Sequence, residues 1–477
     1  MSRFRYTLLL VVYAALSCVM SAVADTTRVV SYPAPRGEVL SNVYRVRVNG
    51  KVVPVYQQRV LDPPFADKYD HGGTYAFASF DCDGPVSVKI DSSRVLDKTI
   101  IRPISKNTVP VMVEKGMLVQ LKGPCKLSVE PDGRNGPLLL FANPIEKDVP
   151  SHDDAGVVYF GPGIHKPHRI RLGSNQTLYL AGGAIVKGSI LASGENITIR
   201  GRGILDGNDW EWRKGPGRMV SIQGCKNVRL EDIIIRGAWG WTVVPEGSSD
   251  VSIRNLKICN SRVQNDDGIN PCNSQNIRIS DCFIRSDDDC IALKGFDYKW
   301  KNNNVEGIVV ENTILWCDRA RIFLLGHESR AQFMRNIRMR NLDIIHFSMT
   351  PFLLEPGEDM HLTNVVFDNV RIHGEGQREL IRLRPVINRY MKKKTPGVIS
   401  DITFRNVRVN GRDGEYRIDV SGYDDNHKVS KIRFENLTVH GKTVTAKDTR
   451  MRIGKHVNEV TFGPDEQRLQ RPQGEHQ

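Results

Sequence analysis

Short stretches of alternating apolar and polar residues recur along most of the chain. Residues 276–284 read Asn-Ile-Arg-Ile-Ser-Asp-Cys-Phe-Ile, the pattern of a half-buried strand. Similar stretches begin at intervals of 23 to 37 residues, at Asn196, Asn227, Asp250, Asn276, Gly307, Asn336, Asn364, Asp401 and Lys431. A repeat of this length predicts a stacked array in which each unit is one coil.

The repeat favours an all-β fold, a right-handed parallel β-helix over residues 149–465. A coil of this size turns through three short strands, and the recurring Asn suits a bend where side chains bond the backbone or stack in a ladder. A β-propeller is the alternative, but its blades are longer, about 40–45 residues, with a different signature.

The segments on either side differ in pattern. Residues 25–148 consist of short alternating stretches separated by Gly, Pro and Asp, as in a β-sandwich. Residues 1–24 have a charged start, an apolar run and Ala22-Val23-Ala24, which predicts a signal peptide cut after Ala24 and a secreted or periplasmic protein. A membrane anchor is the weaker reading because the run is shorter than about 20 residues. Residues 466–477 form a polar tail.

Two acidic segments stand out within the repeats. Asn265-Asp266-Asp267-Gly268 and Asp287-Asp288-Asp289 flank the strand at 276–284, and Asp267 precedes Asp288 by 21 residues. If each repeat is a coil, the two segments lie on neighbouring strands about 4.8 Å apart. Three carboxylates would then share one patch, which indicates a functional site; a calcium site or a solvated Asp turn is the alternative. Asp266 and Asp287 are expected to be either extra acids or solvated turn residues.

The composition and charge of the chain limit the kinds of binding partner that we expect. The chain has 477 residues, is 40% hydrophobic and 25% charged, and has a formal net charge of +13. These fractions are typical of a folded protein. The positive charge fits an acidic partner such as a polyuronate, or cations spread over a large surface. No dense basic block with aromatic residues occurs, so nucleic acid is not an expected partner. No further stretch could span a membrane, and the oligomeric state is not predicted.

Cysteine usage gives no sign of a metal site or cofactor. Eight cysteines follow the signal segment, and an even number in an exported protein permits disulfides. Several occupy inward strand positions, so buried thiols are the favoured interpretation. Neither a C-x-x-C pair nor a His-x-x-x-His spacing is present, and a zinc site is not supported.

The acidic segments also carry a family resemblance. Asn265-x-Asp267-Gly268 followed by Asp288-Asp289-Cys290-Ile291-Ala292 resembles the core of the polygalacturonases, glycoside hydrolase family 28, and of their clan relatives, the family 49 dextranases. The resemblance covers most of residues 157–460. The region before it is more loosely similar to the β-sandwich that precedes the helix in dextranase-type enzymes.

The resemblance implies an inverting glycoside hydrolase that needs no cofactor. In such enzymes a carboxylic acid protonates the leaving oxygen and a carboxylate activates water, with the two groups about 6.5–9.5 Å apart. By position, Asp288 is expected to be the general acid, while Asp267 and Asp289 hold and deprotonate the water. The side chains expected to contact the sugar or to tune the carboxylates are Asn265, Trp241, Lys294, Arg321, His327, Arg330 and Glu355. The arginines could equally be structural ion-pair partners, and Trp241 could be core.

Two departures from the polygalacturonase pattern bear on the substrate. The family's Gly-His-Gly has its nearest match at Gly326-His327-Glu328, later than one coil should lie, and its uronate-binding Arg-Ile-Lys matches Leu353-Leu354-Glu355. An acid at Glu355 would repel a uronate, so a neutral, dextran-type polysaccharide is the favoured substrate. A pectin-type hydrolase, a lyase and a non-catalytic carbohydrate-binding β-helix are the alternatives.

Overall fold

The computed structural model describes residues 27–66, 68–69, 71–297, 300 and 302–463, which form two compact units. The first unit ends at Val149 and the second begins at Pro150, but Val60–Tyr69 also belong to the second unit. The sequence pattern did not separate this segment from the first domain. The predicted signal peptide and polar tail lie outside the described residues.

The first unit is a β-sandwich, as predicted. One sheet has the order β1-β5-β11-β10-β7 with β4 beside β5, and the other has the order β3-β2-β6-β9-β8. Val46 and Val88 of the second sheet and Phe80 and Leu140 of the first belong to one apolar core. The elements are β1 (Val29–Ser31), β2 (Tyr44–Val48), β3 (Lys51–Val53), β4 (Val55–Val60), β5 (Gly73–Cys82), β6 (Val86–Ser92), β7 (Ile100–Arg102), the 3₁₀ turn η1 (Ile104–Lys106), β8 (Pro110–Val113), β9 (Gly116–Leu121), β10 (Cys125–Glu130) and β11 (Leu138–Asn143).

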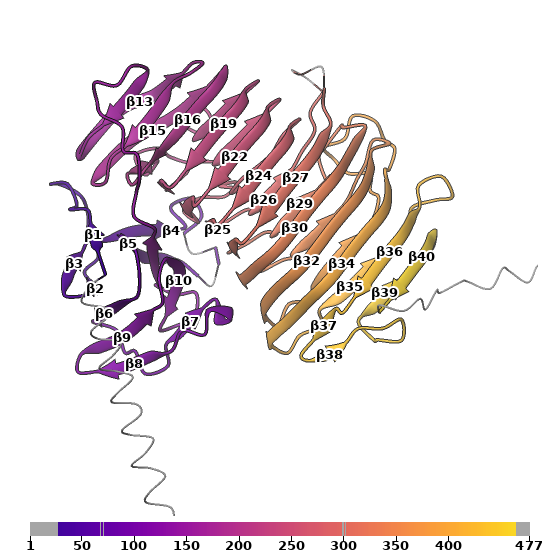
Figure 1. Cartoon of the computed structure of the whole chain (residues 1–477). Helices are drawn as coiled ribbons and strands as arrows, with labels where there is room; N and C mark the ends of the chain where they lie inside the picture. Colours follow the sequence, from indigo (N-terminus) through magenta and orange to yellow (C-terminus); the bar gives the residue numbers. More distant parts are fainter. Residues whose placement is uncertain (1–26, 67, 70, 298–299, 301, 464–477) are drawn as a thin grey trace, which may run out of the picture. The chain divides into compact units, whose positions relative to one another are not determined.

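The second unit is a right-handed parallel β-helix, which confirms the predicted fold class. Figure 1 shows its strands stacked side by side from β13 to β40. They form three columns, and the long strands bend from one column into the next. The first column contains β12 (Val157–Phe160), β14 (Thr177–Leu180), β16 (Glu195–Gly201), β19 (Lys226–Glu231), β22 (Ser249–Arg254), β24 (Gln275–Ser280), β27 (Val305–Glu311), β30 (Phe333–His346), β32 (His361–Glu375), β34 (Val398–Arg412), β36 (Val429–Glu435) and β40 (Val457–Phe462).

The other two columns complete each coil. The second contains β17 (Ile204–Asp206), β20 (Ile234–Arg236), β23 (Lys257–Cys259), β25 (Phe283–Ser286), β28 (Ile314–Cys317), the second halves of β30, β32 and β34, and β37 (Thr438–Val439), which pairs with β38 (Lys442–Thr443). The third contains the second halves of β13 (Gly163–Leu172) and β15 (Ala184–Ala192), whose first halves belong to the second column. It continues with β18 (Val220–Gln223), β21 (Val243–Glu246), β26 (Ile291–Leu293), β29 (Phe323–Leu325), β31 (Phe352–Leu354), β33 (Glu379–Leu383), β35 (Arg417–Val420) and β39 (Met451–Ile453), with Ile269 bridging β21 and β26.

Alternation along each strand decides what faces the interior. In β24, Ile277 and Ile279 are buried while Arg278 is exposed. Ile277 pairs in register with Val251 on one neighbour and Ile308 on the other, so the same inward position is apolar in successive coils. Burial of such apolar columns stabilises the helix by about 25 cal/mol per Å² of apolar surface removed from water.

The recurring Asn residues have the predicted role. Asn196, Asn227 and Asn364 all have positive φ, a conformation that Asn tolerates better than most residues. Their side chains bond along the stack: the Asn227 amide donates to Asn196 at 2.8 Å, and the Asn364 amide donates to Asn336 at 2.7 Å. The predicted ladder at the bends of the coil is therefore confirmed.

Candidate active site

The carboxylates enter the site where the chain turns into the third column. Asp267 lies two residues before Ile269, and Asp289 lies two residues before Ile291, its neighbour on the next coil. The Gly268 amide donates to the Asp289 carbonyl at 2.9 Å. A Cβ on Gly268 would lie 2.4 Å from the carbonyl oxygen of Cys290, which explains glycine at this position. The local backbone thus brings the two acidic segments side by side.

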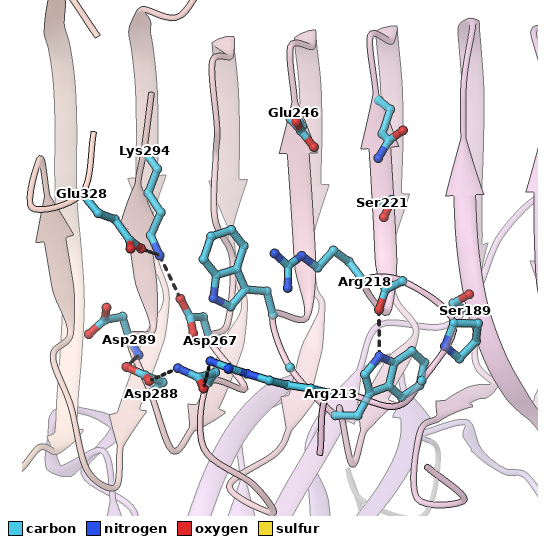
Figure 2. A pocket seen from close by; sticks show the side chains of 18 of the residues that line it. Ser189, Arg213, Arg218, Ser221, Glu246, Asp267, Asp288, Asp289, Lys294 and Glu328 are labelled. Carbon is cyan, nitrogen blue, oxygen red and sulfur yellow. Dashed lines mark hydrogen bonds and ion pairs between the residues drawn. The ribbon is translucent and has the colours of Figure 1, made fainter. Parts of the chain in front are cut away.

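A groove of about 790 Å³ runs over this part of the second unit and contains all three predicted catalytic carboxylates. Figure 2 shows Asp267, Asp288 and Asp289 facing the same space as Lys294, Glu328, Arg213 and Arg218. The residues that line it include Arg169, Ser189, Arg213, Arg218, Ser221, Trp241, Glu246, Asn265, Asp267, Asp288, Asp289, Lys294, Arg321, His327 and Glu328.

Asp267 is almost completely buried at 2% exposure. One oxygen, Oδ2, accepts a hydrogen bond from Asn270 Nδ2 at 2.8 Å and lies 3.5 Å from Lys294 Nζ. Burial raises the pKa of Asp267 well above its usual range; Lys294 lowers it in part, and Asp288 and Asp289 raise it further. Asp267 therefore holds a proton more readily than an exposed aspartate.

Asp288 and Asp289 have different environments. Asp288 Oδ2 accepts hydrogen bonds from Arg319 Nη2 at 2.8 Å and from Asn265 Nδ2 at 3.2 Å, and Oδ1 accepts one from the Asp289 amide at 3.0 Å. Asp289 Oδ1 accepts the Arg321 amide at 3.1 Å. Burial, followed by repulsion from Asp288, raises the pKa of Asp289 to about 6.

The outer acids are structural rather than solvated. Asp266 and Asp287 are both 0% exposed, which contradicts the interpretation as solvated turn residues. The Asp266 carboxylate accepts the backbone amides of Ser261 at 2.7 Å and of Asp287 at 2.7 Å, so it joins the two acidic segments. Asp287 accepts a hydrogen bond from Arg319 Nε at 2.7 Å. Burial raises the pKa of Asp287 to about 7, although Arg319 opposes the shift.

Lys294 is a buried cation between two acids. Its Nζ lies 2.6 Å from Glu328 and 3.5 Å from Asp267, and it lies 3.8 Å from the centre of the Trp241 ring. Burial would lower the pKa of Lys294, but the charges of Asp267 and Glu328 raise it overall. For Glu328, burial acts to raise the pKa, and Lys294 reverses this so that the pKa is lowered. Lys294 thus carries its charge in the site.

Most of the predicted sugar-contacting residues line the groove. These are Asn265, Trp241, Lys294, Arg321 and His327. Arg330 and Glu355 do not line it. Arg330 instead pairs with Glu358 at 3.3 Å, the structural role that the sequence left open for it.

The residue stacked on Asp289 is Arg321, not a histidine. Ile291 pairs with Phe323, so the register places Arg321 one coil after Asp289. His327 lies beyond β29, and its Nδ1–H donates a hydrogen bond to Glu355 Oε2 at 2.9 Å. The match of Gly326-His327-Glu328 to the family's Gly-His-Gly therefore does not hold in space.

Glu355 does not present a free negative charge to the groove. It is 4% exposed, and its carboxylate lies 2.9 Å from His327, 3.4 Å from Arg384 and 3.6 Å from Arg382. Burial acts to raise its pKa, but these neighbours lower it. Arg382 and Arg384 compensate the charge, His327 forms a hydrogen bond with the carboxylate, and Glu355 does not line the groove, so the expected repulsion of a uronate by Glu355 is wrong.

Several groove residues were not predicted. Arg169, Arg213 and Arg218 lie on the coils before Asp267, together with Ser189, Ser221 and Glu246. They are far from the acidic segments along the chain, and the sequence alone does not show that the stacking of the coils brings them into the same groove. In the described part of the chain, no group of three His, Cys, Asp or Glu side chains could hold a metal ion. Of the eight cysteines from Cys82 onward, seven are buried.

Known proteins match the part of the chain that contains the two acidic segments. The model of glycosyl hydrolases family 28 matches residues 179–312. A probable polygalacturonase of Vitis vinifera is 32% identical over 117 residues, 23% of this chain and 23% of its own length. An exopolygalacturonase of Cochliobolus carbonum is 26% identical over 172 residues, 32% of this chain and 36% of its own length. The chain therefore spans about a quarter to about a third of these relatives.

Solved structures share the fold over most of the chain. Dex49A from Penicillium minioluteum has a TM-score of 0.67 at 17% identity, covering 91% of this chain and 96% of its own. A family 28 exopolygalacturonase of Yersinia enterocolitica has a TM-score of 0.52 at 14% identity, with the same coverage. The resemblance predicted from the acidic segments is confirmed: residues 179–312, which contain Asp267, Asp288 and Asp289, match glycosyl hydrolases family 28.

Proposed function

We propose that this protein is a glycoside hydrolase that cleaves a polysaccharide in the groove around Asp267, Asp288 and Asp289. The main support is that three carboxylates from two successive coils converge in one groove, where each residue is at most 8% exposed. Acid–base catalysis of glycoside hydrolysis requires carboxyl groups close together, of which one holds a proton while another stays ionised. A binding protein has no need of this arrangement.

The proposed roles follow the inverting mechanism. Asp288 delivers a proton to the leaving oxygen, while Asp267 and Asp289 hold the water that attacks the anomeric carbon from the opposite face. The water loses its proton to a carboxylate, and the sugar is released with inverted configuration. Asn265, which bonds Asp288, orients that carboxyl and the sugar beside it.

The proton for this step is held by the cluster. Asp289, with a pKa of about 6, and Asp267, with a pKa raised above its usual range, retain protons more readily than exposed aspartates. Interacting carboxyls titrate as a group, so the proton delivered to the leaving oxygen belongs to the cluster as a whole. Arg319 and Asn265 both direct N–H groups at Asp288 Oδ2 and hold that carboxyl in place.

Polygalacturonate is the first candidate substrate. The matching relatives are a probable polygalacturonase and an exopolygalacturonase. Arg382 and Arg384 compensate the charge of Glu355, so this charge does not favour a neutral glycan. A dextran-type glucan is the second candidate. Leu353, at the position of the family's uronate-binding arginine, forms an apolar cluster with Ala292 and Leu324, so that cation is absent from this place in the groove.

The test is release of reducing sugar from polygalacturonate, dextran, pullulan and arabinan by wild type and by Asp288→Asn. We expect release from polygalacturonate that falls by at least about 10²-fold in the variant, as for loss of a general acid. Release without Asp288 dependence would contradict the assigned chemistry. An unsaturated product absorbing in the ultraviolet, or activity lost on chelation, would indicate a lyase instead.

Export is part of the proposal, since a polymeric glycan is met outside the cell. We expect the mature protein to begin at Asp25 after cleavage following Ala24. Intact mass measurement of protein recovered from the producing cells checks the cleavage site. A full-length mass in the cytosolic fraction would contradict it.

A further inference from the structure

We propose that Arg169 and Arg218 form a binding subsite for an anionic substituent of the glycan, on the side of the groove that precedes Asp267 in the coil order. The inference rests on the proposed function for its ligand being a glycan. The two residues enter the groove from different elements: Arg169 lies on β13, and Arg218 lies in the loop two residues before β18. No residue of the acidic segments takes part.

The two guanidinium groups lie over the same stretch of the groove. A Cβ on Gly217, the residue before Arg218, would lie 2.9 Å from Arg169 Nη2, so Arg169 packs directly against that loop. Arg218 is held by the Trp241 ring, whose centre lies 4.1 Å from its guanidinium carbon. Figure 2 shows Arg218 extending toward Asp267 from the neighbouring coils. Stacking fixes the planar group and leaves its N–H edges available.

Four acids of the groove have cationic partners, whereas these two arginines have no ion-pair partner in the described structure. Asp267 and Glu328 face Lys294, Asp288 faces Arg319, and Asp289 faces Arg321. Among the described residues, no carboxylate lies within ion-pair distance of Arg169 or Arg218. Glu246, the carboxylate that lines the same end of the groove, accepts a hydrogen bond from Trp300 Nε1 at 3.0 Å. Guanidinium groups keep their charge at any physiological pH, so Arg169 and Arg218 give this end of the groove an excess of positive charge over Glu246.

A buried hydroxyl beside Arg169 also lacks a partner. Ser189 pairs in register with Arg169, lines the groove, and is 1% exposed. Within the described structure its Oγ has no hydrogen-bond partner. A buried hydroxyl is normally bonded, so an unsatisfied one in a groove indicates a position for a ligand oxygen. Two guanidiniums and a free hydroxyl suit a carboxylate or a sulfate ester on a sugar ring.

The subsite lies away from the bond that is cleaved. Along the third column the order is β13, β15, β18, β21 and then Ile269. β18, which follows Arg218, is therefore two coils before Ile269, and β13, which contains Arg169, is four coils before it. At about 4.8 Å per coil, these positions are about 10 and 19 Å from the coil of Asp267. Arg218 is therefore the nearer of the two to the scissile bond, and a glycan that occupies the coil of Asp267 must be longer than a disaccharide to contact Arg169 as well.

The test is calorimetric binding to full-length Asp288→Asn protein, alone and with Arg169→Gln, Arg218→Gln or both. The probes are oligogalacturonates, sulfated carrageenan oligosaccharides and neutral dextran oligosaccharides, each of two and of six units. Arg229→Gln is the matched control, because Arg229 is an exposed β19 arginine that does not line the groove and that donates a hydrogen bond to Thr198 at 3.3 Å. We expect each groove substitution to weaken six-unit acidic binding by about tenfold, as for one charge-assisted hydrogen bond, without changing neutral binding.

The outcomes separate the proposals. Arginine-dependent binding of oligogalacturonate identifies a carboxylate ligand, and of the carrageenan oligosaccharide a sulfate. Acidic binding that is unchanged in the double variant, an equal loss of neutral binding, or no acidic binding at all overturns the subsite. Arginine-dependent binding by a wild-type protein that hydrolyses none of these glycans would leave the subsite standing and reject the hydrolase. Hydrolysis by a protein whose binding of acidic oligosaccharides does not depend on Arg169 or Arg218 would support the hydrolase and reject the subsite.

Discussion

Arg319 lies one coil after Asp288 and joins it to Asp287, with hydrogen bonds of 2.8 Å from Nη2 to Asp288 Oδ2 and of 2.7 Å from Nε to Asp287 Oδ2. One guanidinium thus connects a groove carboxylate with a carboxylate that is fully buried behind it. Because the fork is rigid, the position of Asp287 fixes the direction from which Arg319 meets Asp288. Arg319 is a positioning residue for the proposed acid.

Replacement of Arg319 should move the pH profile of hydrolysis. In Arg319→Ala the carboxylate cluster loses a cation, so its apparent pKa rises and the basic limb of kcat/KM moves up by about one pH unit or more. Arg319→Lys, which keeps the charge and loses the fork, should move the limb less. A lower kcat with an unmoved limb in both variants would mean that Arg319 only supports the fold.

Asp287 should make the protein less stable as pH rises. Its pKa is about 7 in the folded protein against 3.8 for the free group, so the folded state binds more protons between these values. The stability of wild type relative to Asp287→Asn should therefore fall as pH increases from about 4 to 7. Thermal unfolding of both proteins across this range measures the difference. A difference that is constant with pH would contradict a raised pKa at Asp287.

Lys294 should be required for both stability and activity. Lys294→Met leaves Asp267 and Glu328 buried without their cation, and breaking a buried pair by removing one partner costs about 3–5 kcal/mol. Urea unfolding should show this loss, and hydrolysis should fall because Asp267 becomes more firmly protonated.

Glu328→Gln is the matched control for this prediction, since it keeps Lys294 beside Asp267 and removes only the outer acid. We expect a smaller loss of stability than in Lys294→Met. Equal losses in the two variants would indicate that Glu328, rather than Asp267, is the partner that matters for Lys294.

The Asn ladder should tolerate glycine better than alanine. Asn369 is exposed at the bend of β32, has a φ of 53°, and donates to Asn341 at 3.3 Å. Asn369→Ala and Asn369→Gly both lose this bond, but a Cβ in the left-handed region costs about 1–2 kcal/mol. Alanine should therefore lower the free energy of unfolding by about that much more than glycine. The opposite order would mean that the side-chain ladder, not the backbone, determines the preference for Asn.

The local pattern of the sequence determined the architecture. Alternation in stretches such as 276–284 settles which side chains point inward, because side chains of a strand alternate between its faces. The interval between Asn residues sets the length of a coil, since Asn adopts the positive φ of the bend at low cost. The spacing of Asp267 from Asp288 and Asp289 was informative for the same reason: one coil separates them, and stacked coils are neighbours in space.

The tertiary structure decided everything that depends on exact register or on burial. Coil lengths vary, so the nearest sequence match to the family's histidine was His327, later than one coil should lie, whereas Arg321 is the residue one coil after Asp289. The sequence also read Glu355 as a free charge, although Arg382, Arg384 and His327 surround it. Asp266 and Asp287 look like solvated turn residues in the sequence, yet both are buried. Arg169 and Arg218 are distant from the acidic segments along the chain and share a groove with them only because the coils stack. Charge compensation and burial are properties of neighbours in space, and the linear sequence does not contain them.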